Sequence, residues 1–136
     1  MTAFRPQTHI RLARPVSDLA AAERFHTHGL GLTILYRGNA TAPGEHDLVM
    51  VGIPGAAWHL ELVGGPELST TPSPTIEDLL VFYLDGPVEE NLVDRLLAAG
   101  GTRTSSGPYW DRWGVTIADP DGYRYVLCTR SWNIAP

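Results

Sequence analysis

The feature that most constrains the fold is a β-α-β-β-β order of elements that occurs twice in the 136-residue sequence. In the first occurrence, residues 9–13 alternate apolar and polar side chains, which is the period of a half-buried strand. Residues 18–26 then place Leu19, Ala22 and Phe25 on one face of an amphipathic helix. Three further apolar segments predict strands at 32–36, 47–53 and 57–63.

The same order restarts after a linker at residues 64–75, which is rich in Pro, Gly, Ser and Thr. Residues 79–84 predict a strand, and a helix is expected from Pro87 to the Gly100–Gly101 pair that ends it. The last three strands are expected around Thr102, at 113–118 and at 123–129.

Two modules follow from this pattern, over residues 8–66 and 75–130. Their helices repeat with an offset near 70 residues, although no stretch repeats residue by residue. We expect a single α+β domain over residues 1–136, in which each module covers one face of a mostly antiparallel sheet with its helix.

Composition narrows the class of protein. Hydrophobic residues make up 43% of the chain and charged residues 18%, which is typical of a globular protein. The net charge of −5 and the lack of a basic block argue against nucleic-acid binding. No apolar run reaches the ~20 residues of a membrane helix. The first 15 residues contain no long apolar stretch, so we expect no secretory signal. With Cys128 as its single cysteine, the chain is expected in the cytoplasm, with no membrane partner.

Four motifs occur in a fixed order on this doubled frame. They are His9 on the first strand, the helix end Arg24-Phe25-His26 followed by Leu30-Gly31-Leu32, the strand Trp58–Leu62, and Asp119-Pro120-Asp121-Gly122. In this combination the chain resembles the vicinal oxygen chelate superfamily, which includes glyoxalase I, bleomycin-resistance proteins, extradiol dioxygenases and fosfomycin-resistance enzymes. The resemblance covers nearly the whole chain. It implies that the two modules form a curved mixed sheet around a cavity.

The resemblance also implies a metal site with four positions. These fall on His9 and Glu61 in the first module and on Leu79 and Val126 in the second. Under the module repeat, His9 then corresponds to Leu79, and Glu61 to Val126. Leu and Val cannot donate to a metal, and two protein ligands hold one poorly, so we expect a partial site of His9 and Glu61 and no metal cofactor.

Three alternatives stay open. His59 shares the strand face of Glu61 and could complete a two-His, one-carboxylate set. A register slip of one residue would bring Asp78 to the third position instead of Leu79. In the last alternative, His9 and Glu61 hydrogen-bond each other.

Strand parity predicts the residues that face the cavity and contact a ligand. They are Arg11, His59, Leu79, Val81, Tyr83, Arg124 and Val126. Trp110 and Trp113 follow a loop, and they are a core plug, a dimer contact or a ligand-stacking wall. His26 and His28 lie at a helix C-terminus, where we expect solvated side chains.

Resemblance to the drug-sequestering members implies that the chain binds a small aromatic or amphipathic molecule, as a homodimer. One alternative is a divalent-metal-dependent lyase, isomerase or dioxygenase, in which the metal polarises vicinal oxygens. Another is a metal-free enzyme with His59 or Glu61 as general base. The pattern assigns no catalytic residue.

Overall fold

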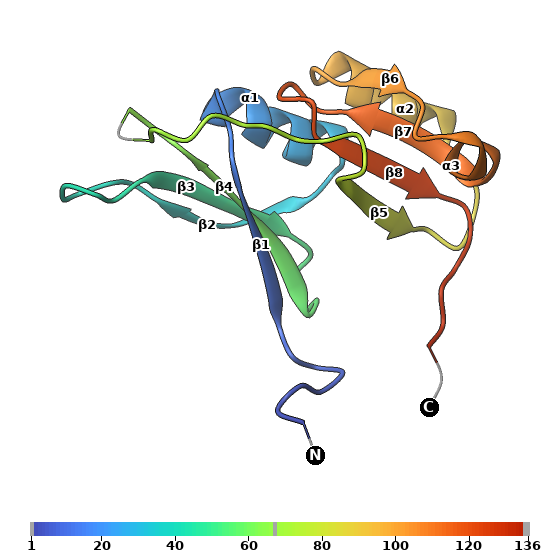
Figure 1. Cartoon of the computed structure of the whole chain (residues 1–136), viewed down its shortest axis with the longest axis horizontal. Helices are drawn as coiled ribbons and strands as arrows, with labels where there is room; N and C mark the ends of the chain where they lie inside the picture. The colour runs from blue at the N-terminus through green and yellow to red at the C-terminus, as the bar shows by residue number, and fades with distance from the viewer. Residues whose placement is uncertain (1, 67, 135–136) are drawn as a thin grey trace. The chain divides into compact units, whose positions relative to one another are not determined.

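The computed structural model describes residues 2–66 and 68–134, which fall into two compact units (Figure 1). The N-terminal unit comprises Met1–Thr27 and Gly31–Pro72, and the C-terminal unit comprises His28–Leu30 and Ser73–Pro136. Each unit holds a four-stranded mixed sheet, which confirms the predicted α+β class. In the described residues, no helix is long and apolar enough to cross a membrane.

The N-terminal unit follows the predicted order of elements. They are β1 (Ile10–Pro15), α1 (Leu19–Arg24), a π-helical turn η1 (Phe25–Gly29), β2 (Thr33–Gly38), β3 (Asp47–Gly52) and β4 (Trp58–Gly64). The strands lie in the order β1-β4-β3-β2, with β1 parallel to β4 and the other pairs antiparallel.

Helix α1 covers one face of this sheet. A Cβ added at Gly64 would lie 3.2 Å from the Cβ of Leu19, so the helix packs closely on the end of β4. Leu60 and Leu62 share the face of Gly64 because residues two apart on a strand point the same way, and both are buried. The core therefore lies on this face, and the opposite face of the sheet is left for the polar residues described below.

A β-bulge in β2 changes the face to which its side chains point. Ile34 pairs with Val51, whereas Tyr36 pairs with Met50, and the register shifts between them. Val51 and Met50 are adjacent residues on β3, so they point to opposite faces. Ile34 therefore joins the core side, and Tyr36 projects from the face opposite α1.

The end of the first helix differs from the prediction. Regular α-helix ends at Arg24 and continues as the π-helical turn. His26 is fully buried rather than solvated, so that prediction is wrong. Its Nδ1–H donates to the carbonyl oxygen of Ala22 over 2.7 Å. Desolvation lowers the pKa of His26 from 6.5 to about 4, which keeps the imidazole neutral at physiological pH.

The C-terminal unit repeats the order with one addition. Its elements are β5 (Leu79–Tyr83), α2 (Glu90–Ala98), β6 (Thr102–Thr104), α3 (Pro108–Trp113), β7 (Gly114–Ala118) and β8 (Arg124–Cys128). The strands lie in the order β5-β8-β7-β6. Helix α3 occupies the segment before β7 that the sequence analysis placed on or beside a loop. Pro108 opens it, consistent with the preference of proline for the first helical position.

Candidate functional site

Two histidines meet on the face of the N-terminal sheet opposite α1. Nε2 of His9 lies 2.7 Å from Nδ1 of His59, and the ring centroids are 4.9 Å apart. One ring donates and the other accepts, depending on their tautomers. Gly52 pairs with His59 on the neighbouring strand, so no side chain stands directly beside the imidazole from β3.

Arg11 and Glu61 form an ion pair on the same face. Nη1 of Arg11 donates to Oε1 of Glu61 over 3.1 Å, with the arginine side chain 54% exposed and the glutamate side chain 8% exposed. In the β1–β4 register, Arg11 lies opposite His59, and Glu61 lies two residues further along β4. The Arg11 side chain therefore extends along the strand to reach the Glu61 carboxylate. Glu61 thus contacts Arg11, and His9 contacts His59. The predicted alternative of a His9–Glu61 hydrogen bond is therefore wrong.

The second ring nitrogen of His59, Nε2, is buried and makes no hydrogen bond to the described residues. A buried polar atom without a partner costs about 1–3 kcal/mol of stability. Either tautomer leaves this nitrogen able to make one further bond, as a donor or as an acceptor.

Apolar side chains border the polar group. Met50 pairs with Glu61 in register, and Tyr36 pairs with Met50. Tyr36 is 57% exposed, and Leu35 is also exposed. A Cβ added at Gly52 would lie 3.2 Å from Cδ1 of Leu35, so the bulge brings Leu35 to this side of the sheet as well.

We call this surface the His59 face. It consists of His9, Arg11, Leu35, Tyr36, Met50, His59 and Glu61. The sequence analysis named only its members on β1 and β4. It missed Leu35, Tyr36 and Met50 because it assigned no residue of β2 or β3 to this face. Strict alternation along β2 would also place Tyr36 on the same side as Ile34, and the bulge reverses that.

The metal that the fold family implies does not fit this face. Among the described residues, no three His, Cys, Asp or Glu side chains lie close enough to hold an ion. The two histidines hydrogen-bond each other. Glu61 already has a cation, the Arg11 guanidinium, against its carboxylate. The two-His, one-carboxylate set is therefore not formed in this arrangement.

The predicted ligand residues of the C-terminal unit do share one face. Leu79 pairs with Arg124, Val81 with Val126, and Tyr83 with Cys128. If Leu79 corresponds to His9, this register makes Val126 the counterpart of His59 rather than of Glu61. The sequence analysis equated Val126 with Glu61, so its alignment of the two modules is off by two residues.

A loop covers part of this second face. Arg124 donates from Nη1 to the carbonyl oxygen of Ser105 over 2.7 Å. Thr116, the β7 neighbour of Val126, donates to Oγ of Ser106 over 2.9 Å. Val126 is fully buried. Polar groups here are thus bonded within the unit, and the side chain of Val126 is not exposed on this face.

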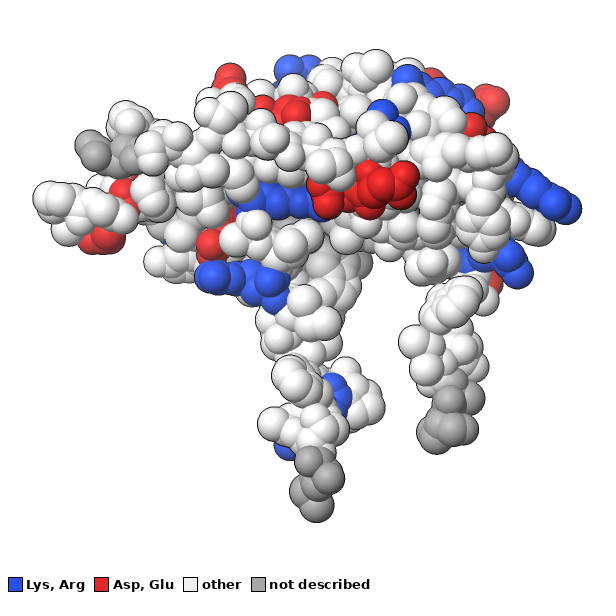
Figure 2. All heavy atoms as spheres, in the orientation of Figure 1, with Lys and Arg blue, Asp and Glu red and all other residues white. Residues whose placement is uncertain are grey.

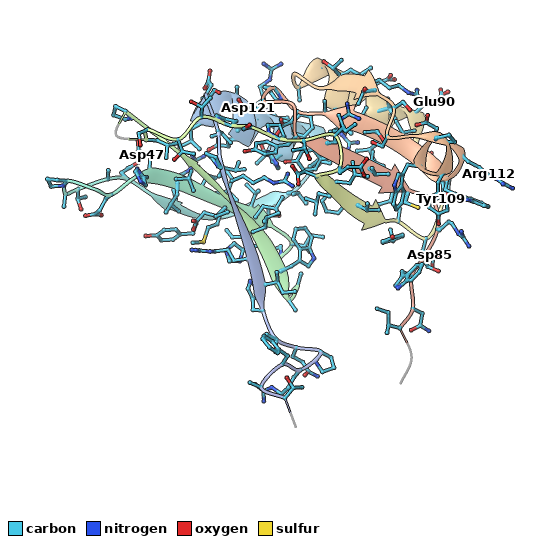
Figure 3. All side chains as sticks on the ribbon, viewed as in Figure 1. Asp47, Asp85, Glu90, Tyr109, Arg112 and Asp121 are labelled. Carbon is cyan, nitrogen blue, oxygen red and sulfur yellow. The ribbon has the colours of Figure 1, made fainter. Side chains whose placement is uncertain are left out.

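The Trp-rich segment is held against the same unit. The Arg112 and Arg130 guanidinium carbons lie 5.0 and 4.6 Å from the ring centroid of Trp113. Trp110 contacts the Tyr109 ring edge-on, with centroids 5.0 Å apart. Figure 3 shows Tyr109 and Arg112 on α3. Both tryptophans are half-buried, and whether they contact a ligand or a second subunit stays a prediction.

Charge is mixed over the surface. On the face drawn in Figure 2, acidic and basic side chains are interspersed, with no broad basic area. The distribution on this face agrees with the net charge of −5.

Solved structures of other proteins share this fold. A fosfomycin-resistance protein, FosX from Mesorhizobium loti, superposes with a TM-score of 0.66 at 14% identity, over 96% of this chain and 94% of that one. TnmS3, an antibiotic binding protein from a Streptomyces species, superposes with a TM-score of 0.60 at 22% identity, over 96% and 100% of the two chains. The fold is that of the vicinal oxygen chelate superfamily, as the sequence motifs indicated.

Matches at higher sequence identity show the family to which this chain belongs. Family models for the YycE-like N-terminal domain and the YycE-like C-terminal domain match residues 10–63 and 77–129. The YycE protein of Bacillus subtilis (strain 168) is 40% identical over 120 residues, which are 87% of this chain and 85% of YycE. The crystal structure of B. subtilis YycE, a protein of unknown function, superposes with a TM-score of 0.81 at 37% identity, over 95% and 93% of the chains. The chain belongs to the YycE-like family.

Proposed function

We propose that this protein binds a small aromatic or amphipathic molecule on the His59 face. The observation that carries the proposal is the buried Nε2 of His59, which lacks a partner among the described residues. A polar atom of a ligand would supply the missing hydrogen bond and remove its cost.

The neighbours of His59 suit a ligand with both polar and apolar parts. Tyr36 offers an exposed ring for stacking, and Met50 and Leu35 add apolar surface beside it. Arg11 and Glu61 neutralise each other, so the face carries little net charge. Binding sites for small molecules commonly combine apolar walls with a few convergent polar groups. The antibiotic binding by TnmS3 shows one use of this fold and supports the proposal by analogy.

A thermal-shift screen of planar aromatic compounds, followed by calorimetric titration of the hits, tests this function. We expect His59→Leu and Tyr36→Ala each to weaken binding by about 10-fold or more, the equivalent of about one hydrogen bond or stacking contact. Tyr109→Ala is the matched control, because it removes an exposed tyrosine from the C-terminal unit. Equal affinities for all four proteins would reject the His59 face as the site.

The expected cytoplasmic homodimer belongs to the same proposal. The half-buried tryptophans of α3 provide the kind of surface that a second subunit covers. Light scattering at micromolar concentration measures the mass directly. A monomeric mass would reject the dimer while leaving the ligand site untouched.

A further inference from the structure

We propose that Arg11 is a built-in cation that excludes divalent metals from the cluster of His9, His59 and Glu61. The inference concerns the protein without any organic ligand, so it stands apart from the proposed small-molecule binding. On this proposal the charge beside Glu61, and not only the spacing of the donor atoms, keeps a divalent metal from these residues.

The three donors are of the right chemical kind. Two imidazoles and a carboxylate are ligands that several divalent transition metals accept. All three side chains lie on one face of the parallel strand pair β1–β4. Nε2 of His59 has no partner among the described residues, and the His9 ring is in direct contact with the His59 ring. The donors are thus neighbours on one face, although no three of the described ones lie close enough to hold an ion in this arrangement.

The Arg11 guanidinium supplies the positive charge beside Glu61 that a metal ion would otherwise supply. Glu61 is buried, and a buried carboxylate needs a positive partner. The guanidinium 3.1 Å away meets that need, and arginine keeps its charge at every accessible pH. A divalent cation at the same carboxylate would have to displace this charge or lie beside it, and both cost free energy.

Removal of Arg11 should therefore create a metal site. Without the guanidinium, the Glu61 carboxylate is left buried and uncompensated, and its side chain is free to turn towards the histidines. A divalent metal then restores the charge balance and takes the free nitrogen of His59. Loss of one positive side chain is expected to convert a protein without a metal site into one that binds a single ion.

Isothermal titration of the protein with Zn²⁺, and absorption spectra with Co²⁺, test the inference on protein without a histidine tag. The wild type should show no saturable binding up to about 1 mM, a free energy near −4 kcal/mol. Arg11→Ala should bind one equivalent at least ~100-fold more tightly, at the upper end of the effect that outer groups have on metal affinity. Co²⁺ should give the visible bands of a protein-bound ion in that variant alone.

Three further proteins make the result specific. Adding Glu61→Gln or His59→Ala to Arg11→Ala should abolish the gained binding. Arg37→Ala is the matched control, because Arg37 and Glu23 form the second described ion pair of this unit, with Nη2 and Oε2 3.0 Å apart. This control should gain no metal binding.

Either of two results overturns the inference. One is stoichiometric metal binding by the wild type, and the other is a folded Arg11→Ala protein that binds no more tightly than the wild type. Arg11→Met keeps the aliphatic stem of the arginine and serves as the test if Arg11→Ala fails to fold. Ligand titrations are unaffected by these outcomes, since no organic compound is present.

Discussion

The two units share one order of strands and helix but differ in the face that lies opposite the helix. In the N-terminal unit this face carries His9, Arg11, His59 and Glu61, with one nitrogen unpartnered among the described residues. In the C-terminal unit the equivalent strands carry Leu79, Val81 and Val126, and a loop bonds to the polar groups beside them. The comparison shows that the repeated strand order places side chains at equivalent positions in both sheets. The residues at those positions differ: they are mostly polar in the N-terminal unit and mostly apolar in the C-terminal unit.

The buried faces of the first helices of the two units also differ in polarity. With the offset of about 70 residues, His26 corresponds to Leu96, and both side chains are fully buried. Leu96 contributes to the core without an electrostatic cost. His26 must stay neutral to be buried. The N-terminal unit therefore depends on pH in a way that this position of the C-terminal unit does not.

The largest expected effect contrasts tryptophan at two positions that face the same way in the two sheets. Val126→Trp should lower the free energy of unfolding by about 3 kcal/mol or more, because Val126 is fully buried and the much larger indole must displace the groups packed against it. Ala13→Trp, at an exposed position beside Glu61, should change it by less than about 0.5 kcal/mol. Urea denaturation measures both. A Val126→Trp protein of native stability would show that this face of the C-terminal unit is open after all.

The next effect tests the difference between His26 and Leu96. The pKa of His26 is lower in the folded protein than its unfolded value of 6.5, so protonation favours unfolding. The stability that neutral His26 contributes is fully present above pH 6.5 and is lost as the pH falls towards 4. We expect the wild type to lose about 3 kcal/mol more than His26→Leu over this range, measured by denaturation at each pH. Parallel pH profiles for the two proteins would contradict the burial of a neutral imidazole.

A smaller effect contrasts two glycines that border these faces. Gly107 has a φ of 100°, so Gly107→Ala should cost about 1–2 kcal/mol through backbone strain, although a Cβ there would meet no atom within 4 Å. Gly52→Ala lacks this strain, and the nearby Leu35 side chain is exposed and able to move. Its stability should change by less than about 0.5 kcal/mol. Thermal unfolding of both variants decides, and the prediction fails if Gly52→Ala is the more damaging.

The smallest effect concerns one hydrogen-bonding group in each unit. His59→Leu removes a buried nitrogen that lacks a partner, and it also removes the bond to His9, whose exposed ring can hydrogen-bond to water instead. Stability should therefore stay unchanged or rise by up to about 1 kcal/mol. Thr116→Val removes a donor that is bonded to Ser106 and should lower stability by about 1 kcal/mol. Calorimetric unfolding measures this difference in sign. A His59→Leu protein less stable than Thr116→Val would mean that His59 serves the fold rather than a ligand.

Much of this arrangement could be predicted from the sequence. Alternation of apolar and polar residues placed Arg11, His59 and Glu61 on one face, since that depends only on the period of a strand. Register between strands was harder, because a shift of two residues leaves the alternation unchanged. For that reason the pairing of Arg11 with Glu61, and the counterpart of His59 in the second module, came only from the structure.

The remaining errors have local causes. Six residues from Pro108 to Trp113 are too few to show helical periodicity, and their aromatic content obscures it. The burial of His26 depends on tertiary packing around a π-helical turn, which its position at a helix end does not reveal. The bulge in β2 has no marker such as a glycine at its centre, where the sequence reads Ile34-Leu35-Tyr36.

That bulge has an evolutionary consequence. One extra residue in β2, Leu35, adds an apolar side chain to the His59 face beside Tyr36. Deleting Leu35 would restore strict alternation and remove that side chain from the proposed binding surface, while Tyr36 keeps its place opposite Met50 and Ile34 and Val51 keep their contact in the core. Relatives that differ by a single insertion at this point can therefore acquire new ligand preferences in one genetic step, with little change to the residues that hold the unit together.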